Sequence, residues 1–135
     1  MTIQLSDTLR TNMAAQYEST IGAAPLLRIY NGTKPATCAA AIGAATQLFN
    51  LALPSDWMTP GAAGTVSKAG TWAGPASATN SASFYRIWNA AGTICGEQGT
   101  VGVTGSGADL EVDNINVTSG LTVTITAWTR TQSGA

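Results

Sequence analysis

The sequence predicts an all-β fold, an antiparallel β-sandwich of the jelly-roll type, with one short N-terminal helix. Beyond the first 25 residues, apolar side chains alternate with small polar ones in short runs, and Gly, Pro and Asn separate those runs. A chain of 135 residues is also the size of one domain with its own core. We therefore expect residues 1–135 to form a single domain of roughly six to eight short strands.

The N-terminal segment, about residues 5–20, is the one stretch with helical spacing. Four apolar side chains recur there at every fourth position, which places them on one face of a helix, and Ser6 or Asp7 can cap its first turn. Gly22 and Pro25 predict its end. The apolar face either packs on its own domain or reaches a neighbouring subunit. Its members are Leu5, Leu9, Met13 and Tyr17.

Turn signals bound the strands that we expect after the helix. Asn31-Gly32 follows the first strand, and Pro54 closes the second. Residues 33–47, between these two strands, fit either a short helix or a loop. The expected strands are Leu26–Tyr30, Leu48–Leu53, a hairpin of Phe84–Trp88 with Thr93–Val103, and two further strands within residues 108–114 and 121–129.

Residues 54–82 are rich in Gly, Ala, Pro and Ser, and we expect them to form a long loop that contains Trp57 and Trp72. Loops of this length in a compact domain usually have a function or are ordered by a partner. The two indoles either cover the ends of the core or contact a partner, since aromatic side chains are enriched in interface hot spots. Exposed on a concave face, they would instead indicate glycan binding.

The composition favours contacts with other proteins. Only 10% of the residues are charged, 44% are apolar, and the formal net charge is −1. Such a balance gives no electrostatic basis for binding nucleic acid or an anionic membrane. No run of residues approaches the length of a membrane span, and the N-terminus does not read as a secretory signal. We therefore expect a soluble protein that is made in the cytoplasm, with Cys38 and Cys95 as reduced, buried thiols.

The sequence offers no convincing catalytic, cofactor-binding or metal site. It contains no histidine, the commonest general base and transition-metal ligand, and no phosphate-binding or dinucleotide-binding motif. Asp109, Glu111 and Asp113 alternate along a predicted strand, so their carboxylates are roughly 7 Å apart pairwise and do not converge on one ion. We expect them to face solvent, over an inward Leu110 and Val112, and to discourage pairing at an exposed strand edge. A subunit contact, or a metal or catalytic role, is the alternative.

Five segments spread over the chain carry a family resemblance: TIQLSDTLRTNMAAQYESTIGAAPLLRIYNGTKPATC, LALPSDWM, AGTWAG, FYRIWNAAGTICGEQGTVG and DLEVDNINVTSGLTVTITAWT. Together they resemble a family of small tailed-phage virion proteins, some of which look like capsid cement or decoration proteins. The resemblance implies a β-sandwich subunit that forms a small homo-oligomer, a dimer rather than a trimer, and clamps neighbouring major capsid subunits. It transfers no active-site residues.

These observations lead us to expect a non-enzymatic structural protein of the virion, made in the bacterial host and placed on the capsid surface. The alternatives are a tail-associated structural protein and a glycan-binding β-sandwich module. The residues that we expect to contact a partner are Leu5, Leu9, Met13, Tyr17, Trp57 and Trp72.

Overall fold

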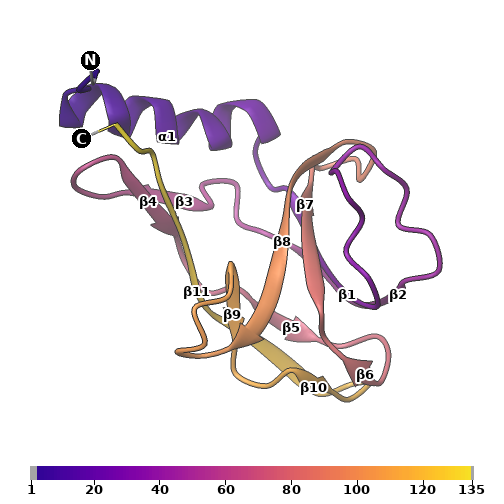
Figure 1. The fold of residues 1–135 in the computed structure, drawn as a ribbon. Coiled ribbons are helices and arrows are strands. Elements are labelled where there is room, and N and C mark those ends of the chain that lie inside the picture. Colours follow the sequence, from indigo (N-terminus) through magenta and orange to yellow (C-terminus); the bar gives the residue numbers. More distant parts are fainter. Residues whose placement is uncertain (1–2, 135) are drawn as a thin grey trace.

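The computed structural model describes residues 3–134 and consists of one helix lying across one end of a strongly curled β-sheet (Figure 1). This confirms the predicted all-β, sandwich-like fold with a short N-terminal helix. Within the described residues, no helix has both the length and the apolar character needed to cross a membrane.

The curled sheet has nine strands, and eight of them follow the order β2-β1-β7-β8-β9-β11-β4-β3, with β5 paired to the long strand β11. All its neighbours are antiparallel except β8 and β9. A second, two-stranded sheet joins β10 to β6. The elements are α1 (Asp7–Ile21), β1 (Leu26–Asn31), β2 (Thr46–Ala52), β3 (Met58–Pro60), β4 (Thr65–Lys68), β5 (Ala73–Pro75), β6 (Asn80–Ser81), β7 (Phe84–Trp88), β8 (Cys95–Val103), β9 (Leu110–Val112), β10 (Asn116–Val117) and β11 (Thr122–Thr131).

Strands predicted from alternation agree with the structure, whereas the predicted long loop at residues 54–82 does not. That stretch contains the four strands β3 to β6, each only two to four residues long. Such strands are too short to produce an alternating pattern, and they form because β11 and β10 supply partners for three of them and β4 pairs with β3. Residues 33–45, left open between helix and loop, contain no helix.

Helix α1 begins at a capped turn and ends at a glycine. Ser6 accepts a hydrogen bond from the backbone N–H of Leu9 at 3.2 Å, and Gly22, with φ of 98°, donates its N–H to the Glu18 carbonyl. Gly96 of β8 lies directly under the helix, since a Cβ at Gly96 would come within 2.5 Å of the Ile21 side chain. The absence of a side chain at this position lets α1 approach the sheet.

The face that α1 buries differs from the predicted one. Its buried residues are Arg10, Ala14 and Ile21, and Tyr17 packs against the core from the same side. Residues spaced strictly four apart drift around a helix of 3.6 residues per turn, so they do not stay on one face. The face that is buried includes Arg10, and a search for apolar residues does not detect a charged one. The prediction of one apolar face from Leu5 to Tyr17 is therefore wrong.

Three tryptophans form the centre of the core. Trp57, Trp72 and Trp128 are at most 1% exposed, and their ring centroids lie 5.4 to 6.2 Å apart. Each buried indole N–H has an acceptor, which removes the cost of burying it. Because Trp57 and Trp72 belong to the segment 54–82 and Trp128 belongs to β11, these side chains tie that segment to the long strand.

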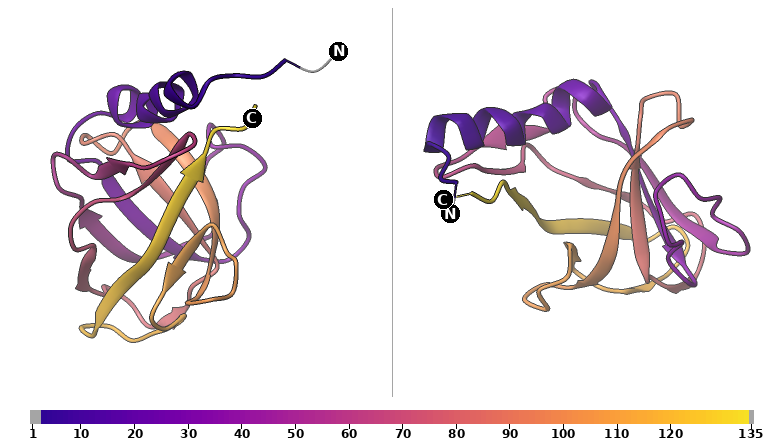
Figure 2. Two further views of the ribbon diagram at one scale, coloured as in Figure 1. Left: turned by 90° about the vertical axis from the view of Figure 1, so that its left-hand side faces the viewer. Right: turned by 45° about the horizontal axis from the view of Figure 1, so that its top comes forward.

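The two ends of the described chain lie together. The backbone N–H of Leu5 donates to the carbonyl of Gly134 at 2.7 Å. Figure 2 shows β11 leading back to the end of α1 at which the helix begins.

Candidate functional site

Helix α1 presents part of the predicted contact face to solvent. Leu9 and Met13 are 46% and 39% exposed, one helical turn apart. Tyr17 turns inward, with its ring edge-on to Trp128 at a centroid distance of 6.2 Å. Leu5 is half-buried and bonded to Gly134 through its backbone. Of the four predicted helix residues, the structure thus leaves Leu9 and Met13 as an open apolar pair.

The two predicted loop indoles are not available to a partner. Trp57 and Trp72 are both fully buried, so the expectation that they contact a partner is wrong for this structure. The reason is that the surrounding Gly-rich and Pro-rich segment folds into strands that use these side chains as core. The glycan-binding alternative depended on exposed indoles at these positions, and it loses that basis.

Two of the acidic residues of residues 108–114 act as local hydrogen-bond acceptors. Asp109 Oδ2 accepts from the backbone N–H and the hydroxyl of Thr100, at 2.9 and 3.1 Å. Glu111 accepts from the N–H groups of Gly105 and Gly107, both at 3.0 Å, and so closes the turn between β8 and β9. Each carboxylate has its own partners, and none converges with another.

Strand β9 itself lies inside the sheet. Leu110 and Val112 are buried as predicted, and Asp113 accepts from the backbone N–H of Thr124 at 3.1 Å. However, β9 pairs with β8 on one side and with β11 on the other, so the prediction of a charged guard on an exposed edge is wrong. Within residues 3–134, no group of three or more His, Cys, Asp or Glu side chains could hold a metal ion.

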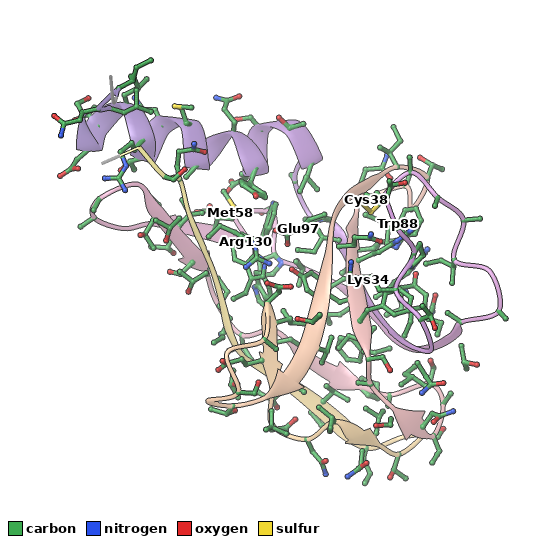
Figure 3. All side chains as sticks on the ribbon, viewed as in Figure 1. Lys34, Cys38, Met58, Trp88, Glu97 and Arg130 are labelled. Carbon is green, nitrogen blue, oxygen red and sulfur yellow. A yellow bond between two sulfur atoms is a disulfide. The ribbon has the colours of Figure 1, made fainter. Side chains whose placement is uncertain are left out.

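A buried polar cluster beneath α1 joins β7, β8 and β11 (Figure 3). Glu97 Oε2 accepts hydrogen bonds from Tyr85 Oη at 2.8 Å, Trp128 Nε1 at 2.9 Å and Arg130 Nη2 at 3.0 Å. Its other oxygen pairs with Arg130 Nε. The Arg130 guanidinium carbon also lies 4.9 Å from the centroid of the Trp128 ring. We call these four side chains the inner cluster.

Protonation in the inner cluster is fixed by its own members. Burial raises the pKa of the Tyr85 hydroxyl, and the Glu97 carboxylate raises it further. Burial is the largest influence on the pKa of Arg130 and would lower it, but the hydrogen bonds to Glu97 together with the charge interactions with Tyr85, Glu97 and Tyr17 outweigh burial, and the pKa is raised. The hydroxyl therefore stays protonated and the arginine charged, an arrangement suited to holding three strands together and not to moving protons.

The opposite face of β7 and β8 carries a fully buried arginine, Arg86. Arg28 of β1 and Arg86 of β7 are direct partners across the two strands, and Asn50 and Gln98 flank them on β2 and β8. Asn50 Oδ1 accepts from Arg28 Nε at 3.0 Å, and Gln98 Oε1 accepts from Arg86 Nε at 3.1 Å. The row thus places two like charges side by side between neutral amides.

Residues 32–45, which we call the flap, cover the Arg86 and Gln98 end of this row. Arg86 Nη2 donates to the flap carbonyls of Thr37 and Ala40, at 3.1 and 2.7 Å. A disulfide joins Cys38 of the flap to Cys95 of β8, so the prediction of two reduced thiols is wrong. The two residues are 57 positions apart in sequence, and only the pairing of β7 with β8 brings Cys95 under the flap.

Two hollows border these regions. One, of about 510 Å³, lies between α1 and β3 and contains Glu18 and Asp56. Burial raises the pKa of Glu18, and the neighbouring Asp56 carboxylate raises it further. The other, of about 500 Å³, lies between the flap and the β7–β8 turn, and it is lined by Ala39–Ala41, Arg86, Trp88, Ile94 and the disulfide.

The sequence pattern gave little sign of the residues in the inner cluster or the covered row. The one feature of the sequence that indicates these residues is Arg86 in the apolar run FYRIW. A charged residue among strand-forming apolar residues must be buried with partners or lie on an outer face. Nothing in the Gly-rich stretch around Glu97 indicated that this residue would be part of a cluster.

No family model, no curated protein and no solved structure matches this chain.

Proposed function

We propose that this chain is a non-enzymatic structural protein of a tailed-phage virion that binds the outside of the capsid and cements neighbouring major capsid subunits. The proposal starts from the resemblance of its segments to small phage virion proteins. The observation that carries it furthest is the open apolar pair Leu9 and Met13 on α1, since a soluble domain with few charges gains from covering such residues with a protein surface.

The internal bonding of the domain supports a structural role. The carboxylates of the inner cluster and of the β8–β9 turn accept hydrogen bonds from the protein itself, which leaves them without a free pair suited to acid and base chemistry. A disulfide and two arginines cross-brace the sheet. Such bracing suits a subunit that must keep its shape under load.

Cement acts by mass action. A subunit that binds the assembled shell but not the dissociated capsid protein stabilises the shell, and a specific contact buries about 800 Å² on each partner. In this proposal α1 makes that contact through Leu9 and Met13, and the protein is a small homo-oligomer, a dimer by preference. A tail-associated structural role is the nearest alternative, with the same kind of contact.

The test begins with virions. Quantitative mass spectrometry of purified particles should find the protein in head fractions, at a copy number in fixed ratio to the major capsid protein. Shells from a phage lacking it should burst at lower temperature than wild-type shells. Recovery in tail fractions alone would reject the capsid assignment in favour of the alternative.

A matched pair of variants then tests the helix. Leu9→Asp with Met13→Asp places two carboxylates in the proposed contact, whereas Thr8→Asp with Asn12→Asp places the same charges one residue earlier on α1, at exposed positions outside the apolar pair. Both proteins should fold, as judged by thermal melting. Only the first should fail to protect shells when added back, and equal protection by both variants would remove α1 from the contact.

A further inference from the structure

Arg86 is a buried cation without a carboxylate partner. It is 1% exposed, and its acceptors are the Gln98 amide and two backbone carbonyls of the flap, all neutral. Within residues 3–134 the ion pairs are Arg10 with Asp7 and Arg130 with Glu97. A charge removed from water in this way is costly unless an opposite charge compensates it, and burial lowers the pKa of Arg86 accordingly.

The surroundings of Arg86 add positive charge. Three of the six basic residues, Arg28, Lys34 and Arg86, belong to β1, the flap and β7, and none of the seven acidic residues lies in these segments. Arg28 stands directly opposite Arg86, and like charges in that relation destabilise a sheet. An anion near the pair would relieve both the repulsion and the burial cost.

One nitrogen of Arg86 is left for such an anion. A guanidinium has five N–H donors, and Nε and Nη2 supply the three hydrogen bonds to Gln98 and the flap. No described residue accepts from Nη1, yet no buried side-chain nitrogen among residues 3–134 lacks a partner. Nη1 is therefore not sealed in the protein, and the open space that Arg86 lines is the 500 Å³ hollow beside the flap.

The walls of that hollow are mostly apolar. They comprise the methyl groups of Ala39–Ala41, Ile94 and the indole of Trp88, which is held in place by its hydrogen bond to Tyr30 Oη at 3.2 Å. The guanidinium carbons of Arg28 and Arg86 lie 5.7 and 5.4 Å from the Trp88 ring centroid. Figure 3 shows Cys38 and Trp88 close together at this edge of the molecule, apart from the inner cluster.

We propose that this hollow is a carboxylate-binding pocket, and that its occupant is a glutamate or aspartate side chain of another protein. The alkyl stem of such a side chain matches the alanine, isoleucine and indole walls, and its carboxylate accepts from Arg86 Nη1. A sugar acid would bring several hydroxyls to walls with few polar groups, and a phosphate needs more donors than one nitrogen offers.

The pocket does not rest on the capsid proposal, and it is tested with the free, disulfide-bonded protein. The probe is N-acetyl-glutamate with its α-carboxyl capped as the methylamide, called N-acetyl-glutamate below, so that the side-chain carboxylate is its one charge. Binding is followed through the indole N–H signal of Trp88 in ¹⁵N NMR spectra. Trp88→Phe identifies that signal by its loss. Wild-type protein should show a saturable shift with N-acetyl-glutamate and none with the neutral, isosteric N-acetyl-glutamine methylamide. Equal shifts with the two probes, or none with either, would overturn the proposal.

A variant pair localises the binding. Ile94→Asp puts a negative charge at the rim of the pocket, on a side chain that is 66% exposed, so the fold is retained. Leu121→Asp adds the same charge at a 63% exposed residue on the turn before β11, outside the pocket lining. Ile94→Asp should weaken N-acetyl-glutamate binding at least about tenfold, because like charges in contact repel strongly, and Leu121→Asp should leave it unchanged. Equal effects would reject this location.

Glucuronate distinguishes the occupant. The assignment of the pocket to a glutamate or aspartate side chain of another protein is supported if glucuronate shifts the Trp88 signal less than N-acetyl-glutamate does at equal concentration. Tighter binding of glucuronate would overturn that assignment in favour of an acidic sugar.

Discussion

The fully buried Arg86 and the partly buried Arg130, on opposite faces of one sheet, are compensated in different ways. Arg130, on the core side, meets the carboxylate of Glu97 and the ring of Trp128. Arg86, on the flap side, meets the ring of Trp88, an amide and two carbonyls, but no carboxylate. The first has a complete set of partners inside the chain, and the second does not. Burial of a charged side chain therefore does not by itself tell whether that side chain stabilises the fold or binds a ligand. The charge of its hydrogen-bond partners distinguishes the two roles.

The largest expected effect comes from removing the compensation on the core side. Glu97→Gln leaves Arg130 buried without its counter-charge, and breaking a buried pair in this way costs about 3 kcal/mol of unfolding free energy. Urea unfolding measures the loss. The double variant Glu97→Gln with Arg130→Met should recover a large part of it, because no unpaired charge remains. A single variant as stable as wild type would show that Arg130 needs no counter-charge.

On the flap side, the next largest loss of stability should follow removal of the disulfide. Replacing Cys38 and Cys95 together with serine removes a crosslink between residues 57 apart, and such a crosslink contributes about 2–4 kcal/mol. The expected result is lower stability with faster proteolytic cleavage within residues 32–45, while near-ultraviolet circular dichroism of the three core indoles is retained. Cleavage elsewhere first would contradict the assignment of the disulfide to the flap.

The charges of Asp109 and Asp113 are compensated in a third way, by hydrogen bonds from backbone N–H groups. Asp109→Asn weakens the acceptor for both Thr100 donors, and we expect a loss of about 1 kcal/mol, as for other charge-assisted hydrogen bonds. Asp113→Asn, with its single contact to Thr124, should cost less. Thermal melting with and without added calcium or chelator checks both variants. A metal-dependent melting temperature in wild type would contradict the separate roles given to these acids.

The smallest effect concerns the neighbouring carboxylates of Glu18 and Asp56. The pKa of Glu18 is raised in the folded protein by burial and by Asp56, so the folded state holds a proton more tightly than the unfolded state does. The free energy of unfolding consequently falls as the pH rises from the unfolded-state pKa of Glu18 through its raised folded-state pKa, and the loss is complete at neutral pH. Glu18→Gln should therefore stabilise the protein at pH 7, by about 0.3 kcal/mol for so exposed a pair.

The advantage of Glu18→Gln should vanish below the ordinary glutamate pKa of about 4.3, where both states are protonated. Urea unfolding at pH 7 and pH 3 compares the two proteins. A constant difference at both values would show that the substitution acts through packing and not through charge.

Sequence reasoning identified the elements with strong local signals. Phe84–Trp88 and the start of β1 at Leu26 were predicted correctly, because alternation and turn residues are local properties. The strands between residues 58 and 81 depend on partners that the chain supplies only 35 residues or more later in three of the four cases, so their composition resembles a loop. The structure, and not the pattern, revealed them.

The candidate sites were harder to predict for the same reason. Cys38 and Cys95 become neighbours only after β7 pairs with β8, and a judgement from the cellular compartment led to the wrong pairing state. For Trp57 and Trp72, small and polar neighbours left open whether the indoles cover the core or contact a partner, and tertiary packing uses them as core. For Leu9 and Met13, the four-residue spacing predicted a shared helix face but not which side of α1 the sheet would bury, since tertiary packing decides that.

The hydrogen bond between Leu5 and Gly134 has a practical consequence. Because Leu5 and Gly134 meet beside the first turn of α1, a label attached next to either residue lies at the same pole as Leu9 and crowds that helix. A circular permutant that joins the ends by a short linker and opens the exposed turn at residues 118–120 would carry a label to the far pole instead.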